Sequence, residues 1–116
     1  MRFPALKIRL SNGPLTAMGP GKADLLDAIR ETGSISAAAK RMKMSYRRAW
    51  ELVDVMNRCF DQPLVQTSPG GAHGGGAQLT PLGARVLARY RALLIKVDAL
   101  AEQELAEIAP HFKSPD

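Results

Sequence analysis

The run GSISAAAKRMKMSYRRAW, residues 33–50, contains two short helical patterns separated by a break of two residues. We expect the first helix to begin after Ser36 as its N-cap, because a serine hydroxyl accepts a hydrogen bond from a backbone N–H that the opening turn leaves free. Lys43 and Met44 would then form the turn, and Ser45 would cap the second helix. Two short helices with so tight a link predict a helix-turn-helix.

Each predicted helix has one apolar face. In the first helix the apolar positions recur at three- and four-residue spacing and include two alanines, which let a second helix approach closely. The second helix has a longer apolar stripe with the same spacing. The two faces predict a helix pair that buries one side and leaves the other free for contact. Their residues are Ile35, Ala38, Ala39 and Met42 in the first helix, and Ala49, Leu52, Val53, Met56 and Phe60 in the second.

Basic side chains gather on and around the second helix. Between residues 40 and 58 there are six Lys or Arg and two acids, so this stretch carries four of the chain's five net positive charges. A solvated helix face usually mixes charges of both signs. Tyr46, Arg47 and Arg48 fall in the first turn of the second helix, the part that meets base edges when a recognition helix enters the major groove, where arginine reads guanine. The other candidates for DNA contact are Ser36, Ser45 and Lys40, placed for phosphate oxygens, and Lys43 in the turn.

A plain helical hairpin is the alternative interpretation, since alanine-rich helices with serine caps are common. The excess of positive charge favours DNA contact over this alternative. We expect Trp50, on the second helix, to lie in the core or against the DNA backbone rather than to stack on a base.

The segment before the helix pair predicts a strand, a connector and a supporting helix. Leu6, Ile8 and Leu10 alternate with polar residues, which is typical of a half-buried strand. Residues 12–21 are rich in Gly and Pro and predict a connector without a regular element. Residues 22–32 have helical spacing and end at a glycine, so we expect a helix that packs across the helix-turn-helix.

A Gly-rich loop between two short strands predicts a wing. Residues 64–68 and 77–79 have strand patterns, and five of the seven residues from 70 to 76 are glycine. Such a loop has little intrinsic structure and can follow a groove after binding, although an idle hairpin loop is the alternative. The run lacks the Gly-Lys-Ser/Thr ending of a phosphate-binding loop of nucleotide enzymes. We expect the wing to contact the minor groove or phosphates through Gly70, Gly71, His73 and Gly74.

The last segment predicts one long helix. Thr80 and Pro81 are suited to its cap and first position, and Pro110 would stop it after about Ala109. Thirty helical residues would span roughly 45 Å, more than one small domain can cover. Pairing with the same helix of a second copy is favoured over folding back onto its own domain. Basic residues precede acidic ones along the helix, so an antiparallel pair would set opposite charges against each other, but the sequence leaves the direction of pairing open. The expected dimerisation stripe follows a seven-residue repeat that Glu104 interrupts, and Val86, Leu93, Leu100 and Leu105 widen it. Its residues are Leu87, Tyr90, Leu94, Val97, Ala101 and Ile108.

Composition limits the function classes. A chain of 116 residues with 46% apolar content predicts one compact domain with an extension, and a pI of about 9.8 suits a surface that binds polyanions. No apolar run is long enough to span a bilayer, and the first ten residues do not form a secretory signal, so we expect a cytoplasmic location. Two histidines and one cysteine, Cys59, which we expect to be buried, compose neither a metal site nor a nucleophile and base pair. Catalysis and a cofactor are therefore not expected.

The motifs SISAAAK and SYRRAW, with the Gly-rich stretch ending in LT and the long helix after it, resemble the N-terminal winged-helix domain of the molybdate-responsive ModE regulators, a relative of the LysR-type DNA-binding domain. The resemblance covers about nine-tenths of the chain. It implies a dimer joined by the long helices, with residues 70–76 as the wing and with Ser36, Ser45, Tyr46, Arg47 and Arg48 facing DNA.

The chain departs from the family pattern in three places. Lys43 stands where the family often has glycine, which would cost about 1 kcal/mol if this residue adopts the left-handed conformation. The wing lacks the lysine often found there. Family members commonly carry a C-terminal portion that binds molybdate, for which a chain ending at Asp116 has no room, so direct oxyanion sensing is not expected.

Together these patterns predict a mainly α protein with a small β wing. The winged helix-turn-helix domain would cover 1–79, the long dimerisation helix 80–109 and a tail 110–116. We expect a homodimeric transcription regulator that binds specific double-stranded DNA sequences and acts in molybdenum-related gene control. The alternatives for effector sensing are a separate partner and a small pocket that forms only in the dimer. The alternative is a protein-interaction module of the same fold. RNA binding is disfavoured, because the aromatic residues do not cluster as a base-stacking platform.

Overall fold

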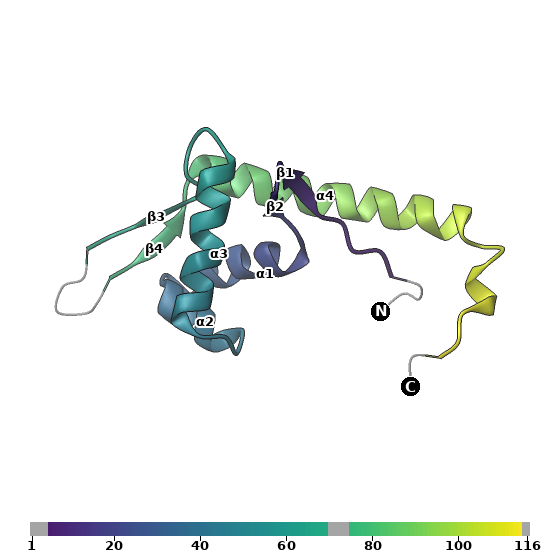
Figure 1. Cartoon of the computed structure of the whole chain (residues 1–116), viewed down its shortest axis with the longest axis horizontal. Helices are drawn as coiled ribbons and strands as arrows, with labels where there is room; N and C mark the ends of the chain where they lie inside the picture. The colour runs from purple at the N-terminus through teal and green to yellow at the C-terminus, as the bar shows by residue number, and fades with distance from the viewer. Residues whose placement is uncertain (1–4, 70–74, 115–116) are drawn as a thin grey trace.

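The hydrophobic core lies where three helices meet, and a fourth, much longer helix runs across it and extends well beyond it (Figure 1). The computed structural model describes residues 5–69 and 75–114. A mainly α fold with a small β wing is confirmed. In chain order the elements are β1 (Leu10–Asn12), β2 (Leu15–Met18), α1 (Pro20–Thr32), α2 (Ile35–Arg41), α3 (Tyr46–Cys59), β3 (Val65–Thr67), β4 (Ala77–Leu79), α4 (Pro81–Glu104) and a short 3-10 helix (Ala109–His111).

The supporting helix α1 forms the centre of the core. It begins at Pro20, two residues before the expected start, because proline suits the first helical position, where no N–H is needed. It ends at Gly33, whose φ of 81° is the left-handed conformation that glycine adopts without strain. Its apolar side is buried and contacts both α2 and α3, as predicted. The buried residues are Ala23, Leu25, Leu26, Ala28 and Ile29.

The apolar faces of α2 and α3 pack as predicted. Ala38 and Ala39 are buried on α2, where their small side chains allow the close approach of α3. Ala49, Val53 and Met56 are buried on α3, while Met42, Leu52 and Phe60 are partly buried against the same core. The two helices therefore present one buried side each, and their opposite sides remain at the surface.

The segment before α1 differs from the sequence prediction. Residues 5–9 form no strand, and the expected connector contains β2, which pairs with β1 in an antiparallel hairpin. The alternating pattern at residues 6–10 misled the prediction because no described strand pairs with residues 5–9, whereas the two-residue turn Gly13–Pro14 joins β1 to β2 directly. Gly13 has a φ of 59°, which glycine accepts without strain. The hairpin contacts α3, and the Asn12 side-chain amide donates to the Cys59 carbonyl at 2.9 Å.

The wing strands β3 and β4 form the predicted antiparallel pair, with Gln66 opposite Gln78. The Asn57 side chain on α3 braces the start of β3: its Oδ1 accepts from the backbone N–H of Leu64 at 2.8 Å and of Val65 at 3.2 Å. Cys59, near the end of the same helix, is half-buried rather than fully buried as expected.

Helix α4 begins as predicted and ends earlier. The Thr80 hydroxyl accepts from the Gly83 N–H at 2.9 Å and donates to the Pro63 carbonyl at 2.7 Å, so the cap also joins the helix to the segment just before β3. The helix ends at Glu104 rather than near Ala109. Its last turn holds no basic residue, and acids at a C-terminus oppose the helix dipole. None of the described helices, α4 included, has the length and apolar composition that crossing a membrane requires.

The first half of α4 packs onto its own domain, which corrects part of the predicted dimerisation stripe. Leu87 and Tyr90 are each 2% exposed and belong to the protomer's core. The Tyr90 hydroxyl donates to the Ile8 carbonyl at 2.6 Å, and burial raises the pKa of this phenol. Leu94 is also partly buried against the core. The heptad pattern did not distinguish contact with the chain's own domain from contact with a second copy.

The rest of the predicted stripe lies outside the core. Val97 and Ala101 are half-buried on the second half of α4. Ile108 is exposed and lies beyond the end of the helix, so it does not continue the stripe.

Substituting Gly83 with alanine should destabilise the protein strongly. A Cβ atom at this position would lie 2.1 Å from the Leu64 carbonyl oxygen, so the backbone of α4 or β3 would have to shift. We expect a loss of about 2 to 3 kcal/mol in the free energy of unfolding, measured by chemical denaturation. Gly21→Ala is the matched control, because a Cβ atom there would meet nothing within 4 Å, and it should leave stability unchanged or slightly higher. Equal stability of the two variants would contradict the close approach at Gly83.

Candidate nucleic-acid interface

The turn between α2 and α3 sets the angle between the two helices. Lys43 has a φ of 57°, so the residue that stands at the turn adopts the left-handed conformation. The Met44 N–H donates to the Ala39 carbonyl at 3.0 Å, which closes the turn after the helix has ended. A side chain in this conformation costs about 1 kcal/mol relative to glycine. This cost is offset by the helix packing, and the Lys43 side chain is exposed beside the opening of α3.

The first cap lies two residues earlier than predicted. Ser34, not Ser36, is the N-cap of α2: its Oγ accepts from the Ala37 N–H at 3.0 Å. Ile35 becomes the first helical residue, which buries its side chain in the core. Burial of Ile35 selects this register over the one starting after Ser36. Ser36 is left exposed on the surface of α2 with its hydroxyl unused for capping.

The second cap and the opening turn of α3 are as predicted. The Ser45 Oγ accepts from the Arg48 N–H at 3.0 Å. Tyr46, Arg47 and Arg48 are all exposed in the turn that this cap begins. Trp50 is 49% exposed, which excludes the core position and leaves contact with the DNA backbone as the remaining part of the prediction. The inward side of α3 is occupied by its stripe of smaller residues, which leaves the indole one turn above Tyr46 on the outer surface.

The two arginines of this turn are available for contact. The Arg47 guanidinium lies 3.2 Å from a Glu51 carboxylate oxygen, but the arginine side chain is 89% exposed. Exposed pairs four residues apart on a helix contribute about 0.3 to 0.5 kcal/mol, so a phosphate or a guanine can replace the carboxylate at small cost. Arg48 makes no ion pair with any residue that the structure describes.

The base of the wing lies against the opening of α2 and α3. The Ala77 N–H donates to the Gly33 carbonyl at 2.8 Å, which ties β4 to the junction of α1 and α2. A hollow of about 160 Å³ lies between these elements and is lined in part by Ser36, Tyr46 and Thr67. Helix tip and wing therefore share one surface. The wing contacts predicted for Gly70, Gly71, His73 and Gly74 lie outside the described residues.

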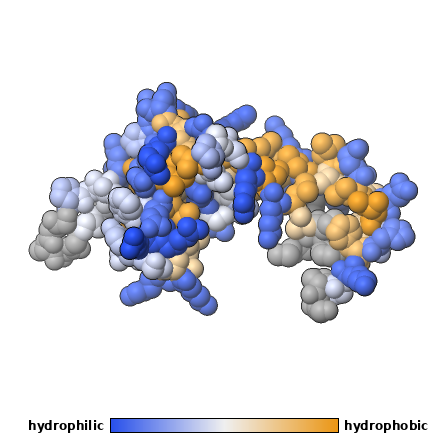
Figure 2. All heavy atoms as spheres, viewed as in Figure 1, coloured by the Kyte–Doolittle hydropathy of each residue, from blue (hydrophilic) through white to orange (hydrophobic). Residues whose placement is uncertain are grey.

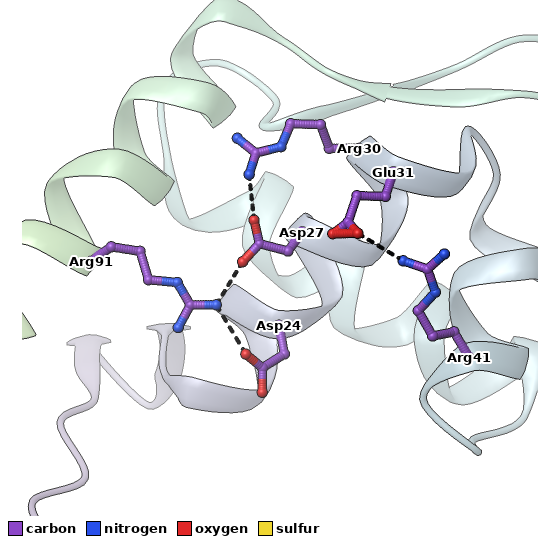
Figure 3. A network of polar contacts seen from close by, with 6 residues as sticks. All are labelled: Asp24, Asp27, Arg30, Glu31, Arg41 and Arg91. Carbon is purple, nitrogen blue, oxygen red and sulfur yellow. Dashed lines mark hydrogen bonds and ion pairs between the residues drawn. The ribbon is translucent and has the colours of Figure 1, made fainter.

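Lys40 and Lys43 extend the positive surface along the outer side of α2 and the turn, where both side chains are exposed. Arg41 differs from them because its guanidinium is paired with Glu31 on α1 at 3.1 Å (Figure 3). Within the described ranges, no group of three potential metal ligands comes together. Apart from Glu51, which pairs with Arg47, the polar side chains named on this face are cations and hydroxyls, which suit phosphate and base edges.

A charge network that the sequence analysis did not foresee joins α4 to α1. Arg91 donates to Asp27 at 2.7 Å and to Asp24 at 2.9 Å, and Asp27 also accepts from Arg30 at 2.6 Å (Figure 3). Hydrogen bonding to Asp27, followed by that to Asp24, raises the pKa of Arg91 against the opposing effect of burial. The partners are more than sixty residues apart along the chain, so no local pattern could predict them. Arg91 is therefore occupied within the protomer.

Comparison with known families and structures agrees with this geometry. Residues 22–84 match the family described as bacterial regulatory helix-turn-helix protein, lysR family. The DNA complex of the CbnR DNA-binding domain has a similar fold, with a TM-score of 0.56 and 22% identity, over 74% of this chain and 93% of that one.

Curated relatives are similar over the same part of the chain. Molybdenum transport protein ModE of Azotobacter vinelandii is 45% identical over 92 residues, which are 76% of this chain and 34% of that protein. Molybdenum-pterin-binding protein MopB of Rhodobacter capsulatus is 49% identical over 66% of this chain and 28% of its own length. DNA-binding transcriptional dual regulator ModE of Escherichia coli K12 is 41% identical over 61% of this chain and 27% of its own length. The chain thus spans about a third or less of the length of these relatives.

The corrected cap can be tested by two neighbouring serine substitutions. Ser34→Ala should lower the free energy of unfolding by about 1 kcal/mol, since it removes the side-chain acceptor for the Ala37 N–H. Ser36→Ala should leave stability unchanged or slightly higher, because alanine favours the helix interior. Denaturant titration of both variants measures this difference, and a larger loss for Ser36→Ala would restore the register that begins after Ser36.

Proposed function

Because the chain belongs to the lysR family of bacterial regulatory helix-turn-helix proteins, which its residues 22–84 match, we propose that it is a non-enzymatic transcription regulator that binds specific double-stranded DNA as a homodimer. The observation that carries the proposal is the exposed opening turn of α3. This turn presents two arginines and a tyrosine to solvent on a helix whose opposite side is anchored in the core.

Helix α3 has the properties of a recognition helix. Its first turn projects at the surface, so base edges in a major groove can approach Arg47 and Arg48 without rearrangement of the core. Arginine forms paired hydrogen bonds with guanine O6 and N7. Ser36, Lys40, Lys43 and Ser45 lie around this turn and would contact phosphates, which orient the helix in the groove. The predicted domain division, with residues 1–79 for DNA contact and α4 for assembly, is part of this proposal.

A second copy would pair along the outer side of α4. With Leu87 and Tyr90 buried in the chain's own core, the available stripe is displaced around the helix. It consists of the exposed Leu93 and Leu100, with the partly buried Leu82 and Val86 at its base. Leu93 and Leu100 are 39% and 57% exposed, and hydrophobic side chains cover the part of α4 that extends beyond the core (Figure 2). Burying such a stripe in a twofold pair would stabilise the dimer and fix the separation of two recognition helices.

An apolar hollow at the base of α4 supports pairing along this stripe. It has a volume of about 550 Å³ and is lined by Leu10, Phe60, Val86 and Leu93, among others. The far half of a partner's α4 could fill it in an antiparallel pair. Arg85 and Arg89 near the start of the helix would then approach the acidic residues Glu104 and Glu107 of the second copy, which favours this direction over a parallel one.

The relatives suggest the genes that are controlled. Several are named as molybdenum transport or molybdenum-pterin-binding proteins, and others as transcriptional regulators. We propose that this chain controls molybdenum-related genes in the cytoplasm and that the effector is sensed by a separate partner. Because the matching region is about a third or less of each relative, no effector site is assigned to the residues described.

Removing either arginine of the recognition turn should weaken specific DNA binding. Arg47→Ala and Arg48→Ala are each expected to cost on the order of 1 to 3 kcal/mol in binding free energy. The measurement is a titration of promoter fragments from the chain's own genomic neighbourhood at physiological salt. Arg58→Ala is the control, since Arg58 lies at the other end of α3 and is paired with Asp54 at 3.2 Å.

Two results would contradict direct readout. One is the absence of any specific complex with these fragments, with the affinity confined to a protein partner. The other is specific binding that is indifferent to both opening-turn arginines while Arg58→Ala weakens it equally.

Charged residues placed in the proposed dimer contact along α4 should separate the dimer. Leu93→Glu and Leu100→Glu would bury unpaired carboxylates in the proposed pair, so both should shift the sedimentation coefficient from that of a dimer to that of a monomer. Ile95→Glu is the matched control, because Ile95 is 72% exposed and lies on the opposite side of the helix. A wild-type protein that is monomeric at micromolar concentration, or a dimer that Ile95→Glu disrupts as fully as Leu93→Glu, would refute this dimer contact.

A further inference from the structure

A hollow with an unusual concentration of positive charge lies between the N-terminal hairpin, the start of α1 and the first turns of α3. Its volume is about 400 Å³. Arg9 precedes the hairpin, Lys22 belongs to the first turn of α1, and Arg48 belongs to the opening turn of α3. Three cations from three separate elements thus line one small space.

Among the described residues, no carboxylate lines the hollow beside these cations. The residues that line the hollow include no Asp or Glu, and Arg9, Lys22 and Arg48 form no ion pair with any part of the chain that the structure describes. Burial, and then the positive charges of Arg48 and Arg9, lower the pKa of Lys22. The folded chain therefore holds like charges together at an energetic cost that an anion in the hollow would remove.

Neutral groups around the cations also suit an anion. Thr16 on β2, which carries a hydroxyl, lines the hollow, as do Gly19 and the exposed Gly21. Arg9 covers Gly19 closely, since a Cβ there would lie 3.5 Å from the Arg9 Cγ. Helix α1 begins here without a side-chain cap and without an acid in its first turn, so its free N–H groups add donors to those of the cations.

We propose that this hollow binds one phosphate group, held by the Arg9 and Arg48 guanidinium groups and the Lys22 ammonium. Guanidinium groups bind phosphate oxygens through paired hydrogen bonds, and an ammonium adds a compact charge. The group can come from the DNA backbone beside the recognition helix or from free phosphate. The DNA source rests on the function proposed above. With a DNA phosphate in the hollow, Arg48 contacts the backbone, which narrows the direct base readout proposed above to Arg47.

The salt dependence of DNA affinity tests the first source. Lys22→Gln should reduce the slope of log affinity against log salt by about 0.9, which corresponds to a roughly fivefold loss at about 0.15 M salt. The loss should be equal for specific and non-specific sequences, because a phosphate carries no base information. Arg9→Gln should behave alike. Lys113→Gln removes the same charge at the opposite end of the chain and should change the slope by less than half as much.

Thermal unfolding of the DNA-free protein tests the second source. Inorganic phosphate, compared with chloride at equal ionic strength and pH, should raise the melting temperature in proportion to the logarithm of its concentration, and Lys22→Gln should abolish this rise. In chloride alone Lys22→Gln should melt no lower than wild type, since it relieves repulsion. A merely structural role of Lys22 would instead lower the melting temperature in both salts.

The salt dependence of DNA affinity and the thermal unfolding in phosphate together distinguish the two sources of the anion from the absence of a site. A reduced slope places a DNA phosphate in the hollow, and a Lys22-dependent stabilisation by phosphate with an unchanged slope places a free anion there. If neither occurs, the proposal is refuted. If wild-type protein forms no specific DNA complex, the proposed regulatory function fails, while the phosphate titration still decides whether the hollow binds an anion.

Discussion

The contact between the small residues of α2 and the apolar stripe of α3 is the interaction on which the rest of the structure depends. Ala38 and Ala39 bring the two helix axes close, and Ala49, Val53 and Met56 complete the core from the other side. Burial of these side chains holds Lys43 in a left-handed conformation that a lysine would not otherwise adopt. It also directs the opposite side of α3 to solvent. The positively charged tip is therefore exposed because the other side of the same helix is packed.

Periodicity in the sequence predicted the elements whose partners are neighbours in the chain. The helix pair, the supporting helix and the wing strands were predicted in place, because alternation and helical spacing report which side of a local element is buried. The first cap was displaced by two residues, since Ser34 and Ser36 are equally good acceptors and only the burial of Ile35 distinguishes them. The hairpin before α1 was missed because turn residues at 12–21 were interpreted as a connector, although Gly13 and Pro14 can join two strands as a tight turn.

The features that the sequence could not predict depend on contacts between distant segments. The ion pairs from Arg91 to Asp24 and Asp27 cross from the last helix to the first, and Tyr90 reaches back to Ile8. These contacts hold the first half of α4 against the chain's own core, with Leu87 and Tyr90 of the expected dimerisation stripe buried there. The cationic hollow has the same origin, because Arg9, Lys22 and Arg48 are separated along the chain and meet only when the hairpin folds against α1 and α3. The charge count of the sequence predicted a basic protein, but it did not show where three cations would come together.

The close approach at Gly83 has a mechanical consequence for a paired protein. Helix α4 starts against the Leu64 carbonyl with no side chain between them, so its direction is set where it leaves the domain. Its 24 residues extend about 36 Å at 1.5 Å each, and a tilt of about 10° at the base would displace the far end by roughly 6 Å. That displacement approaches the rise of two DNA base pairs. The close contact at Gly83 would thus fix the direction of α4. In a twofold assembly, that direction would determine which spacing of DNA half-sites the two domains can bind.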